Sequence, residues 1–355
     1  MAYNRTHDWL TRLPKVDLHL HLDGSVKPET ILELALDQGI DLPVYDKEGL
    51  IPHMRVGEEC GSLIEYLSKF DFTTRFLQSG EALERVAYEV AQQSAEHNCK
   101  YVEVRFAPQL HRNNGLTVEE TILHVVAGMR RGQRDFGVKA GVIAICMRNH
   151  SCESNLEVIR AAAEYVGKGV VAVDLAGDEA SYPPEWFREV FAESGKLGIP
   201  VTIHAGEAAG AMNVYEAVTN LGAVRIGHGV RLKENSDILE MVKDRRIPLE
   251  MCPISNIQTK AVSGWEAYPI REYLEHGLLV TINTDNPSVS GTNITKEYRV
   301  LSDRFGFTEH ELVKLVMNGV DAAFMEENDK LLLRREMEAE IHSLGMSLWT
   351  ENSTM

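Results

Sequence analysis

The hydrophobic and polar positions along the chain follow two different periods in turn. Short runs rich in valine, isoleucine and leucine recur eight times, as buried strands do. They cover residues 15–23, 101–108, 139–147, 170–177, 200–207, 224–229, 248–253 and 279–285. Between them lie longer stretches with the spacing of helices, among them 81–98, 156–166, 184–198 and 267–277. Several of these stretches end in glycine, which is typical of a helix C-terminus.

Strands that alternate with helices predict β–α–β units and a parallel sheet. Eight such units predict an α/β protein with a TIM-type (β/α)8 barrel, and no strand runs into the GxGxxG pattern of a dinucleotide-binding fold. The spacing predicts extra helices inserted between strands 1 and 2 and after strand 8. The first insertion should lie over the C-terminal mouth of the barrel as a lid. Because no Gly/Ser/Pro-rich linker interrupts the chain, we expect a single domain over residues 1–355.

The first strand, within "KVDLHLHLDGS", alternates apolar and polar residues. Successive side chains of a strand point to opposite faces, so the leucines should face one way and the polar residues the other. The polar face would comprise Asp17, His19, His21 and Asp23. A solvated strand face is the ordinary meaning of such a pattern, and a lone His-x-His pair is weak evidence for a metal.

Polar residues also stand at the C-terminal ends of other predicted strands, where barrels of this type carry their catalytic groups. The full set is His19, His21 and Asp23 on the first strand, Gly177 on the fourth, His204 and Glu207 on the fifth, His228 on the sixth, and Asp285 and Asn286 on the eighth. A single buried histidine is more often packed and hydrogen-bonded than a ligand. Imidazole and carboxylate groups at the ends of four separate strands are unlikely to occur together by chance. Their joint presence favours a metal-dependent catalytic site at the rim.

Three imidazoles and one carboxylate from this rim, His19, His21, His204 and Asp285, form a set that suits Zn²⁺, with Fe²⁺, Co²⁺ and Mn²⁺ as alternatives. A catalytic site keeps one open position, and zinc lowers the pKa of water bound there to about 7. Two-metal barrels of this architecture carry a modified lysine on the fourth strand. That strand ends here in "DLAG", so we expect one zinc ion per chain.

Composition narrows the possible partners and location. The net charge of −17 argues against nucleic acid, because binding to phosphates depends on lysine and arginine. The five cysteines form no CxxC pair and are expected to remain reduced. The N-terminal segment lacks the apolar run of a signal peptide, and no apolar run is long enough to span a bilayer. We therefore expect a cytoplasmic protein without membrane contacts.

An ordered set of motifs resembles the adenosine deaminase family, the mononuclear zinc branch of the amidohydrolase-like barrels. "HLHLDGS" resembles the HxHLDG signature of that family. The further matches are "DLAGDE" from Asp174, "HAGE" from His204, "IGHG" from Ile226, "CPISN" from Cys252 and "NTDNP" from Asn283. They occur in the family's order between Val16 and Pro287, which makes them far stronger evidence than the histidine pair alone.

The resemblance implies a hydrolase of purine salvage that converts adenosine and 2′-deoxyadenosine to inosine and 2′-deoxyinosine, with release of ammonia. Zinc, held by the four ligands named above, would activate a water that attacks C6 of the purine. Glu207 would protonate N1. His228 would orient or deprotonate the attacking water and stabilise charge near the metal.

The same resemblance implies that His21, Asp23, Gly177 and Asn286 contact the small-molecule purine nucleoside. The Gly177 N–H would meet N3, and Asp23 would accept a hydrogen bond from the ribose 5′-hydroxyl. Asn286 replaces the family's second aspartate, and its amide can donate to N7 at any pH. The stripe formed by Leu63, Tyr66, Leu67 and Phe70 resembles the family's apolar lid, although an amphipathic helix packed on the barrel explains it equally well.

Several alternatives stay open at this stage. Other deaminases of the class act on AMP, on free adenine or on 5′-modified adenosine such as methylthioadenosine. The charge of Asp23 would repel a 5′-phosphate, and free adenine would leave it without a partner. A non-catalytic purine-binding protein would be expected to lack a ligand or Glu207, and neither is missing. A metal-dependent hydrolase of amides or esters is disfavoured by the missing lysine. The oligomeric state is left open.

Overall fold

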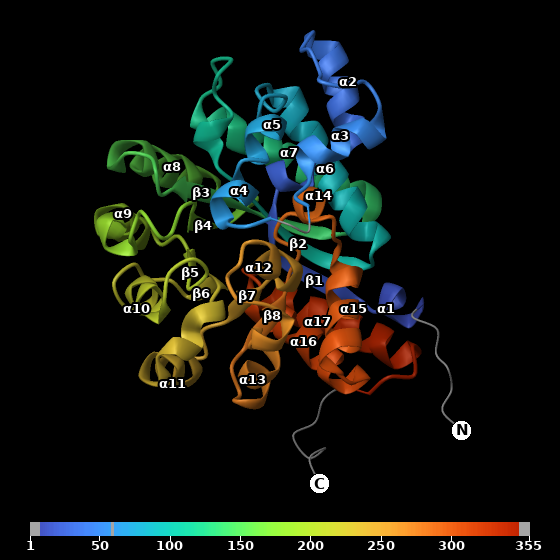
Figure 1. The fold of residues 1–355 in the computed structure, drawn as a ribbon, viewed down its shortest axis with the longest axis vertical. Coiled ribbons are helices and arrows are strands. Elements are labelled where there is room, and N and C mark those ends of the chain that lie inside the picture. The colour runs from blue at the N-terminus through green and yellow to red at the C-terminus, as the bar shows by residue number, and fades with distance from the viewer. Residues whose placement is uncertain (1–7, 58–59, 348–355) are drawn as a thin grey trace.

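The computed structural model describes residues 8–57 and 60–347. Parallel strands lie at its centre and helices surround them (Figure 1). The strands are β1 (Lys15–His21), β2 (Cys99–Phe106), β3 (Lys139–Met147), β4 (Val170–Ala176), β5 (Thr202–Ala205), β6 (Arg225–His228), β7 (Leu249–Met251) and β8 (Val280–Ile282). β1 to β4 pair in sequence order in one four-stranded sheet, and β5 to β8 pair in the same way in a second.

The two sheets meet at both seams, so the strands close into a barrel. At one seam Val173 of β4 pairs with Val201, just before β5. At the other seam the His21 N–H donates to the Asp285 carbonyl, and the Asp285 N–H donates to the His19 carbonyl, each over 2.7 Å. The predicted α/β barrel is confirmed. Its second seam sets the end of β1 directly beside the segment that follows β8.

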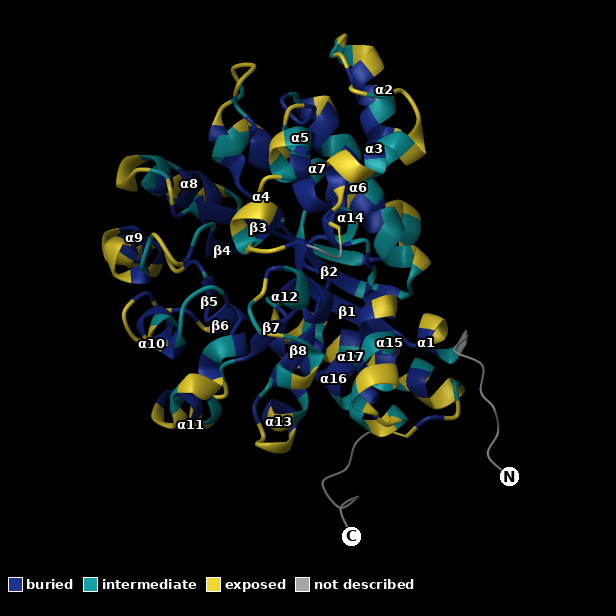
Figure 2. Ribbon diagram, viewed as in Figure 1, coloured by how far each residue is buried: buried dark blue, intermediate teal, exposed yellow. Residues whose placement is uncertain are grey.

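The outer helices bury the faces that they turn to the strands and expose the opposite faces (Figure 2). Helix α6 (Gly80–Glu96) precedes β2, and helices then follow each later strand. These are α7 (Val118–Phe136), α8 (Cys152–Tyr165), α9 (Arg188–Leu197), α10 (Ala211–Thr219), α11 (Ser236–Asp244), α12 (Pro253–Gln258) with α13 (Ile270–Glu275), and α16 (Glu309–Ala322). No helix within the described residues is long and apolar enough to cross a membrane.

The extra helices lie where the spacing predicted them. The segment between β1 and β2 contains α2 (Pro28–Gln38), α3 (Lys47–Met54), α4 (Leu63–Leu67) and α5 (Phe70–Thr74) in addition to α6. After β8 come α14 (Pro287–Ser290), α15 (Ile294–Phe305) and, beyond α16, α17 (Glu327–Ser343). A short α1 (Asp8–Arg12) precedes the barrel.

Local capping explains where the helices begin and end. In α7 the Thr117 hydroxyl accepts from the Glu120 N–H, and the Glu120 carboxylate accepts from the Thr117 N–H, which forms a capping box.

The helix predicted over 267–277 is shorter than expected and begins at Ile270. Pro269 is the reason, because a proline disfavours helical conformation in the residue before it, and Tyr268 is extended.

The first strand departs from simple alternation, so the prediction that both aspartates share the face of the histidines is wrong for Asp17. The register of β1 against β2 shifts between Asp17 and Leu20. The Asp17 carboxylate turns to Thr284, whose hydroxyl donates to Oδ2 over 2.6 Å. An irregularity of this kind breaks the period of two. β1 ends at His21, and Asp23 lies in the 3₁₀ turn that follows.

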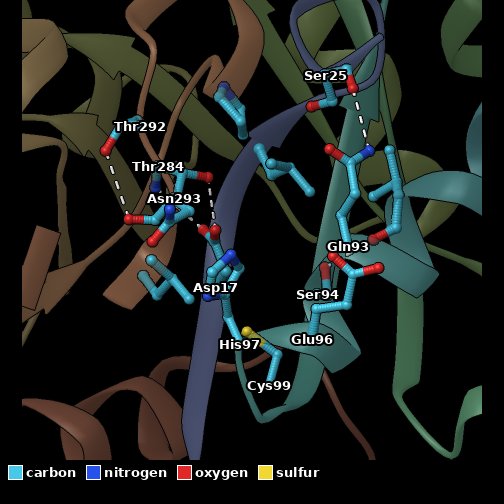
Figure 3. A pocket seen from close by; sticks show the side chains of 14 residues that line it. Asp17, Ser25, Gln93, Ser94, Glu96, His97, Cys99, Thr284, Thr292 and Asn293 are labelled. Atoms are coloured by element: carbon cyan, nitrogen blue, oxygen red, sulfur yellow. Dashed lines mark hydrogen bonds between the residues drawn. The ribbon is translucent and has the colours of Figure 1, made fainter. Parts of the chain in front are cut away.

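Asp17 and Leu20 line a cavity of about 220 Å³ between β1, α6 and the start of α15 (Figure 3). Its other polar walls come mainly from α6 and the residues after it, with Gln93, Ser94, Glu96 and His97 facing Asp17 and Asn293. None of the residues predicted for the catalytic rim lines this cavity. It lies behind β1 and is separate from the site described next.

Candidate active site

Imidazoles and a carboxylate from four parts of the barrel converge at its C-terminal rim. His19, His204, His228 and Asp285 each contribute one possible ligand atom, and these atoms lie within 4.8 Å of one another. His21 also reaches the group, because its Nε2 lies 3.3 Å from Nε2 of His204 and 3.3 Å from Oδ1 of Asp285. All the histidines and the aspartate predicted for metal binding are therefore brought together.

Three of the distances between these atoms match those expected around a tetrahedral zinc ion. Zinc–nitrogen bonds of 2.0–2.1 Å require tetrahedral ligand atoms to lie about 3.3 Å apart. The two His21 distances have this length, and Nε2 of His19 lies 3.4 Å from Oδ1 of Asp285. Nε2 of His19 is buried and has no hydrogen-bond partner within the described residues. A buried nitrogen lone pair without a hydrogen-bond donor can be satisfied by a bound cation. The residues at this site therefore fit a metal ion.

A buried charge network behind the histidines sets which ring nitrogen faces the centre. Nδ1 of His19 lies 2.7 Å from Glu250, and Nδ1 of His204 lies 2.9 Å from Asp174. Arg105 joins the two carboxylates with 2.8 Å contacts to each. Nδ1–H donates to a carboxylate in both rings, which leaves the Nε2 lone pairs free for a metal. Burial lowers the pKa of His19 to about 4, so that ring is neutral.

The carboxylates of this network remain charged although they are buried. Burial alone would raise the pKa of Asp174, but its contacts with His204 and Arg105 outweigh burial and hold it below its ordinary value. Burial opposes ionisation of Glu250 in the same way, and its two arginine partners, Arg105 and Arg225, hold its pKa well below the ordinary value.

The network residues Arg105, Asp174 and Glu250 were not predicted as functional. Each lies inside an apolar run, within "YVEVRFAP", "VVAVDLAG" and "PLEMCP". A charge in the middle of a strand that is otherwise apolar is a usable signal, because such a charge must find a partner when it is buried. The sequence did not indicate which residues pair.

Two residues of the rim are held in left-handed backbone conformations. His228 has a φ of 65° and Asp285 a φ of 60°. Positive φ is uncommon outside glycine and clusters at functional sites.

The Asp285 carboxylate is fixed further by Ser255, whose hydroxyl donates to Oδ2 over 2.5 Å. Burial opposes its ionisation, but the neighbouring His19 and His21 imidazoles hold its pKa well below the ordinary value.

Glu207 lies beside this group on the loop after β5. Its Oε1 accepts a hydrogen bond from the Thr259 hydroxyl over 3.0 Å, and its Oε2 lies 3.6 Å from Nε2 of His228. Burial raises the pKa of Glu207, which favours the protonated acid. A cavity of about 470 Å³, bordered by Leu63 of α4 and by Lys260, leads from this carboxyl group outward.

Asp23 and Asn286 offer unpaired oxygens at the same rim. Oδ1 of each is buried and finds no hydrogen-bond partner within the described residues. Burial raises the pKa of Asp23 to about 6. Gly24 permits the close approach of Asn286, because a Cβ at Gly24 would lie 2.0 Å from the Asn286 oxygen. Gly177 follows β4 with a φ of 108°, a conformation that favours glycine.

The predicted lid covers the end of β1. The Phe70 ring of α5 lies 6.4 Å from the His21 ring, and the Thr73 hydroxyl donates to the Asp23 carbonyl. Tyr66 of α4 is buried, and its hydroxyl lies 2.6 Å from the Ser290 hydroxyl of α14. These contacts set α4 and α5 over the rim.

Comparisons with known proteins agree with this architecture. The family model described as adenosine deaminase matches residues 14–340. A protein named adenosine deaminase from Clostridium botulinum (strain Okra / Type B1) is 43% identical over 324 residues, which are 91% of this chain and 96% of the relative.

Two solved structures are similar over nearly their whole length. The adenine deaminase from Arthrobacter aurescens has a TM-score of 0.84 and 27% identity, covering 93% of this chain and 99% of that one. A cog1816 amidohydrolase from Burkholderia ambifaria, determined with bound Zn, has a TM-score of 0.86 and 26% identity, covering 96% of this chain and 94% of that one.

Proposed function

The chain belongs to the adenosine deaminase family, and from this premise we propose that it hydrolyses adenosine and 2′-deoxyadenosine to inosine and 2′-deoxyinosine with release of ammonia. The observation that carries the proposal is the buried Glu207 beside the convergent histidines and Asp285. The reaction belongs to purine salvage in the cytoplasm, and residues 1–355 act as one deaminase domain.

We assign one Zn²⁺ to His19, His21, His204 and Asp285. The 3.3 Å distances from Nε2 of His21 to Nε2 of His204 and to Oδ1 of Asp285 support this set. His228 is left out because Nδ1 of its ring is engaged by Asn256 and its Nε2 faces Glu207. A zinc ion held by these four residues would supply Lewis-acid activation of water at neutral pH.

Glu207 acts as the acid that gives a proton to N1 of the purine. Addition to C6 pushes electron density onto the ring, and a proton at N1 stabilises that charge. A positioned acid of this kind contributes about 10²–10⁴-fold to the rate. Burial favours its protonated form, and Thr259 fixes the orientation of the carboxyl group.

The substrate is bound by four residues of the rim, namely His21, Asp23, Gly177 and Asn286. The unpaired oxygen of Asp23 accepts a hydrogen bond from the ribose 5′-hydroxyl, which favours a nucleoside over free adenine. With a pKa of about 6, Asp23 is charged at neutral pH and repels a 5′-phosphate. The Asn286 amide donates to N7, and the Gly177 N–H meets N3.

A substrate panel tests the proposal. Purified protein should contain about one zinc per chain and convert adenosine to inosine, followed by the falling ultraviolet absorbance. Adenine, AMP and 5′-methylthioadenosine should react more slowly. Exclusive use of 5′-methylthioadenosine would overturn the role of Asp23, and failure to use any of these compounds would overturn the function.

A Glu207→Gln variant tests the acid. Its kcat should fall about 10²–10⁴-fold, while Glu234→Gln, an exposed carboxylate on the next loop, serves as the matched control. Near-normal turnover by Glu207→Gln would exclude Glu207 as the proton donor.

A further inference from the structure

Asn256, the last residue of "CPISN", is fully buried and contacts His228. Its amide nitrogen Nδ2 lies 3.0 Å from Nδ1 of His228. Its amide oxygen Oδ1 accepts from the backbone N–H of Cys252 over 3.2 Å and from the hydroxyl of Tyr268 over 3.1 Å. All three contacts are buried, so each donor must meet an acceptor.

These contacts leave a single orientation for the amide. A backbone N–H can only donate, so the Asn256 atom that faces Cys252 must be the oxygen. Tyr268 donates to the same oxygen, and burial raises the pKa of its hydroxyl so far that it keeps its proton. The atom facing His228 is therefore the nitrogen, which carries two hydrogens and no acceptor lone pair.

The orientation of Asn256 sets the tautomer of His228. Because the amide can only donate, Nδ1 of His228 must accept and carries no hydrogen. A neutral imidazole holds one N–H, so the hydrogen is on Nε2. That nitrogen lies 3.6 Å from Oε2 of Glu207, which is too long for a direct hydrogen bond and leaves its N–H directed at the reacting centre.

We propose that Asn256 is a positioning residue that holds His228 as the Nε2–H tautomer, so that His228 donates a hydrogen bond to the oxygen attacking C6 and does not act as its base. This inference rests on the proposed function. Glu207 then gives its own proton to N1 and, as the resulting carboxylate, takes the proton that the attacking oxygen loses, so that one N–H bond forms, one O–H bond breaks and Glu207 ends protonated. That hydrogen bond orients the attacking oxygen, and misplacing a reacting group by about 1 Å lowers a rate by about 100-fold.

Asn256→Asp reverses one contact and keeps the other two. The aspartate is isosteric and still accepts from Cys252 and Tyr268, but it now accepts from Nδ1 of His228 as well. The ring must then become the Nδ1–H tautomer with a bare Nε2. We expect kcat to fall about 100-fold with little change in KM. A base at Nε2 would work as well or better in this variant, so an unchanged or higher kcat overturns the proposal.

Nitrogen-15 NMR of the metal-loaded enzyme with labelled histidine reports the tautomer without measuring activity. The His228 signals, assigned by their loss in His228→Gln, should show Nε2–H in the wild type and Nδ1–H in Asn256→Asp. Nδ1–H in the wild type overturns the proposal whatever the activity. The expected tautomer in a protein that does not deaminate adenosine would instead reject the proposed function alone. Asn318→Asp, a buried asparagine that donates to Val280, is the matched control and should leave the His228 signals unchanged.

A second pair of variants keeps the test decisive if Asn256→Asp does not fold. His228→Gln can donate near the position of Nε2 but cannot serve as a base, whereas His228→Glu can accept a proton there. Both replace a residue with positive φ, so their backbone strain is comparable. We expect the glutamine variant to retain the higher kcat, and the reverse order would overturn the proposal.

Discussion

Oε2 of Glu179 lies 3.0 Å from the backbone nitrogen of Glu207 and binds the loop that carries the proposed acid. The same carboxylate accepts further N–H groups from the rest of that loop, namely those of Gly206, Ala208, Ala209 and the side chain of Asn213. A carboxylate suits this position because every group around it donates. Glu179 therefore fixes the position of the loop that carries Glu207.

Glu179→Gln should reduce catalysis although Glu179 itself touches no substrate atom. The glutamine places an N–H₂ group against backbone N–H donors, so the loop must move. A displacement of about 1 Å at a reacting group lowers the rate by about 100-fold. We expect kcat for adenosine to fall by this factor. Glu185→Gln, an exposed carboxylate nearby, is the control, and equal kcat in both variants would contradict the role of Glu179.

Arg105→Met should destabilise the barrel and weaken metal retention together. Removing one partner of a buried ion pair lowers stability by about 3–5 kcal/mol, because the remaining charges stay buried. Here Asp174 and Glu250 would lose the cation that they share, and both contact histidines that we propose as zinc ligands. Urea denaturation and metal content of the purified variant measure the two effects.

Arg85→Met provides the matched comparison for Arg105→Met. Arg85 pairs with Glu33 and Glu89 on the outer helices and is 31% exposed, and pairs of this kind contribute about 0–1 kcal/mol. A similar loss of stability in both variants would mean that the buried network contributes no more than a surface pair.

Glu297 should make the protein less stable as the pH rises towards 8. It is fully buried in α15, and burial raises its pKa from 4.5 to about 8, while Thr292 and the Ile254 N–H donate to it. Between these two values the folded chain holds a proton that the unfolded chain has released. Stability from this group is therefore present below pH 4.5 and is lost as the pH rises through 8, with a slope of up to about 1.4 kcal/mol per pH unit.

Glu297→Gln should remove this slope, since an amide does not titrate in this range. Urea denaturation at several pH values from 5 to 8 measures it for the wild type and the variant. Glu266→Gln, an exposed carboxylate, should keep the wild-type slope. Parallel curves for the wild type and Glu297→Gln would show that Glu297 is ionised in the folded protein at all these values.

Removal of the metal should lower thermal stability as well as abolish deamination. A ligand that binds only the folded state stabilises it by about 4 kcal/mol when its free concentration is 1,000 times Kd. We expect chelation to lower Tm and added Zn²⁺ to restore it. His204→Gln should make Tm insensitive to zinc, whereas the exposed His276→Gln should respond as the wild type does. A zinc response in His204→Gln would remove His204 from the ligand set.

The repeating pattern of the chain was sufficient to predict the barrel and the rim. Eight apolar runs separated by helical stretches predict eight β–α units, and the period of two places His19 and His21 on one face of β1. These properties depend on neighbours in the sequence, so they can be read without a structure. The same reasoning failed for Asp17, because the irregularity in β1 has no signature in the alternation of its residues.

The contacts that orient the histidines of the site depend on the tertiary structure. Arg105, Asp174 and Glu250 come from β2, β4 and β7, and they meet only because the closed barrel turns all three side chains to its interior. Asn256 faces His228 because β6 and β7 are neighbours. The sequence by itself determined which residue types reach the rim. Ring closure decided which of them touch, since residues far apart in the chain have no shared period that could record a contact.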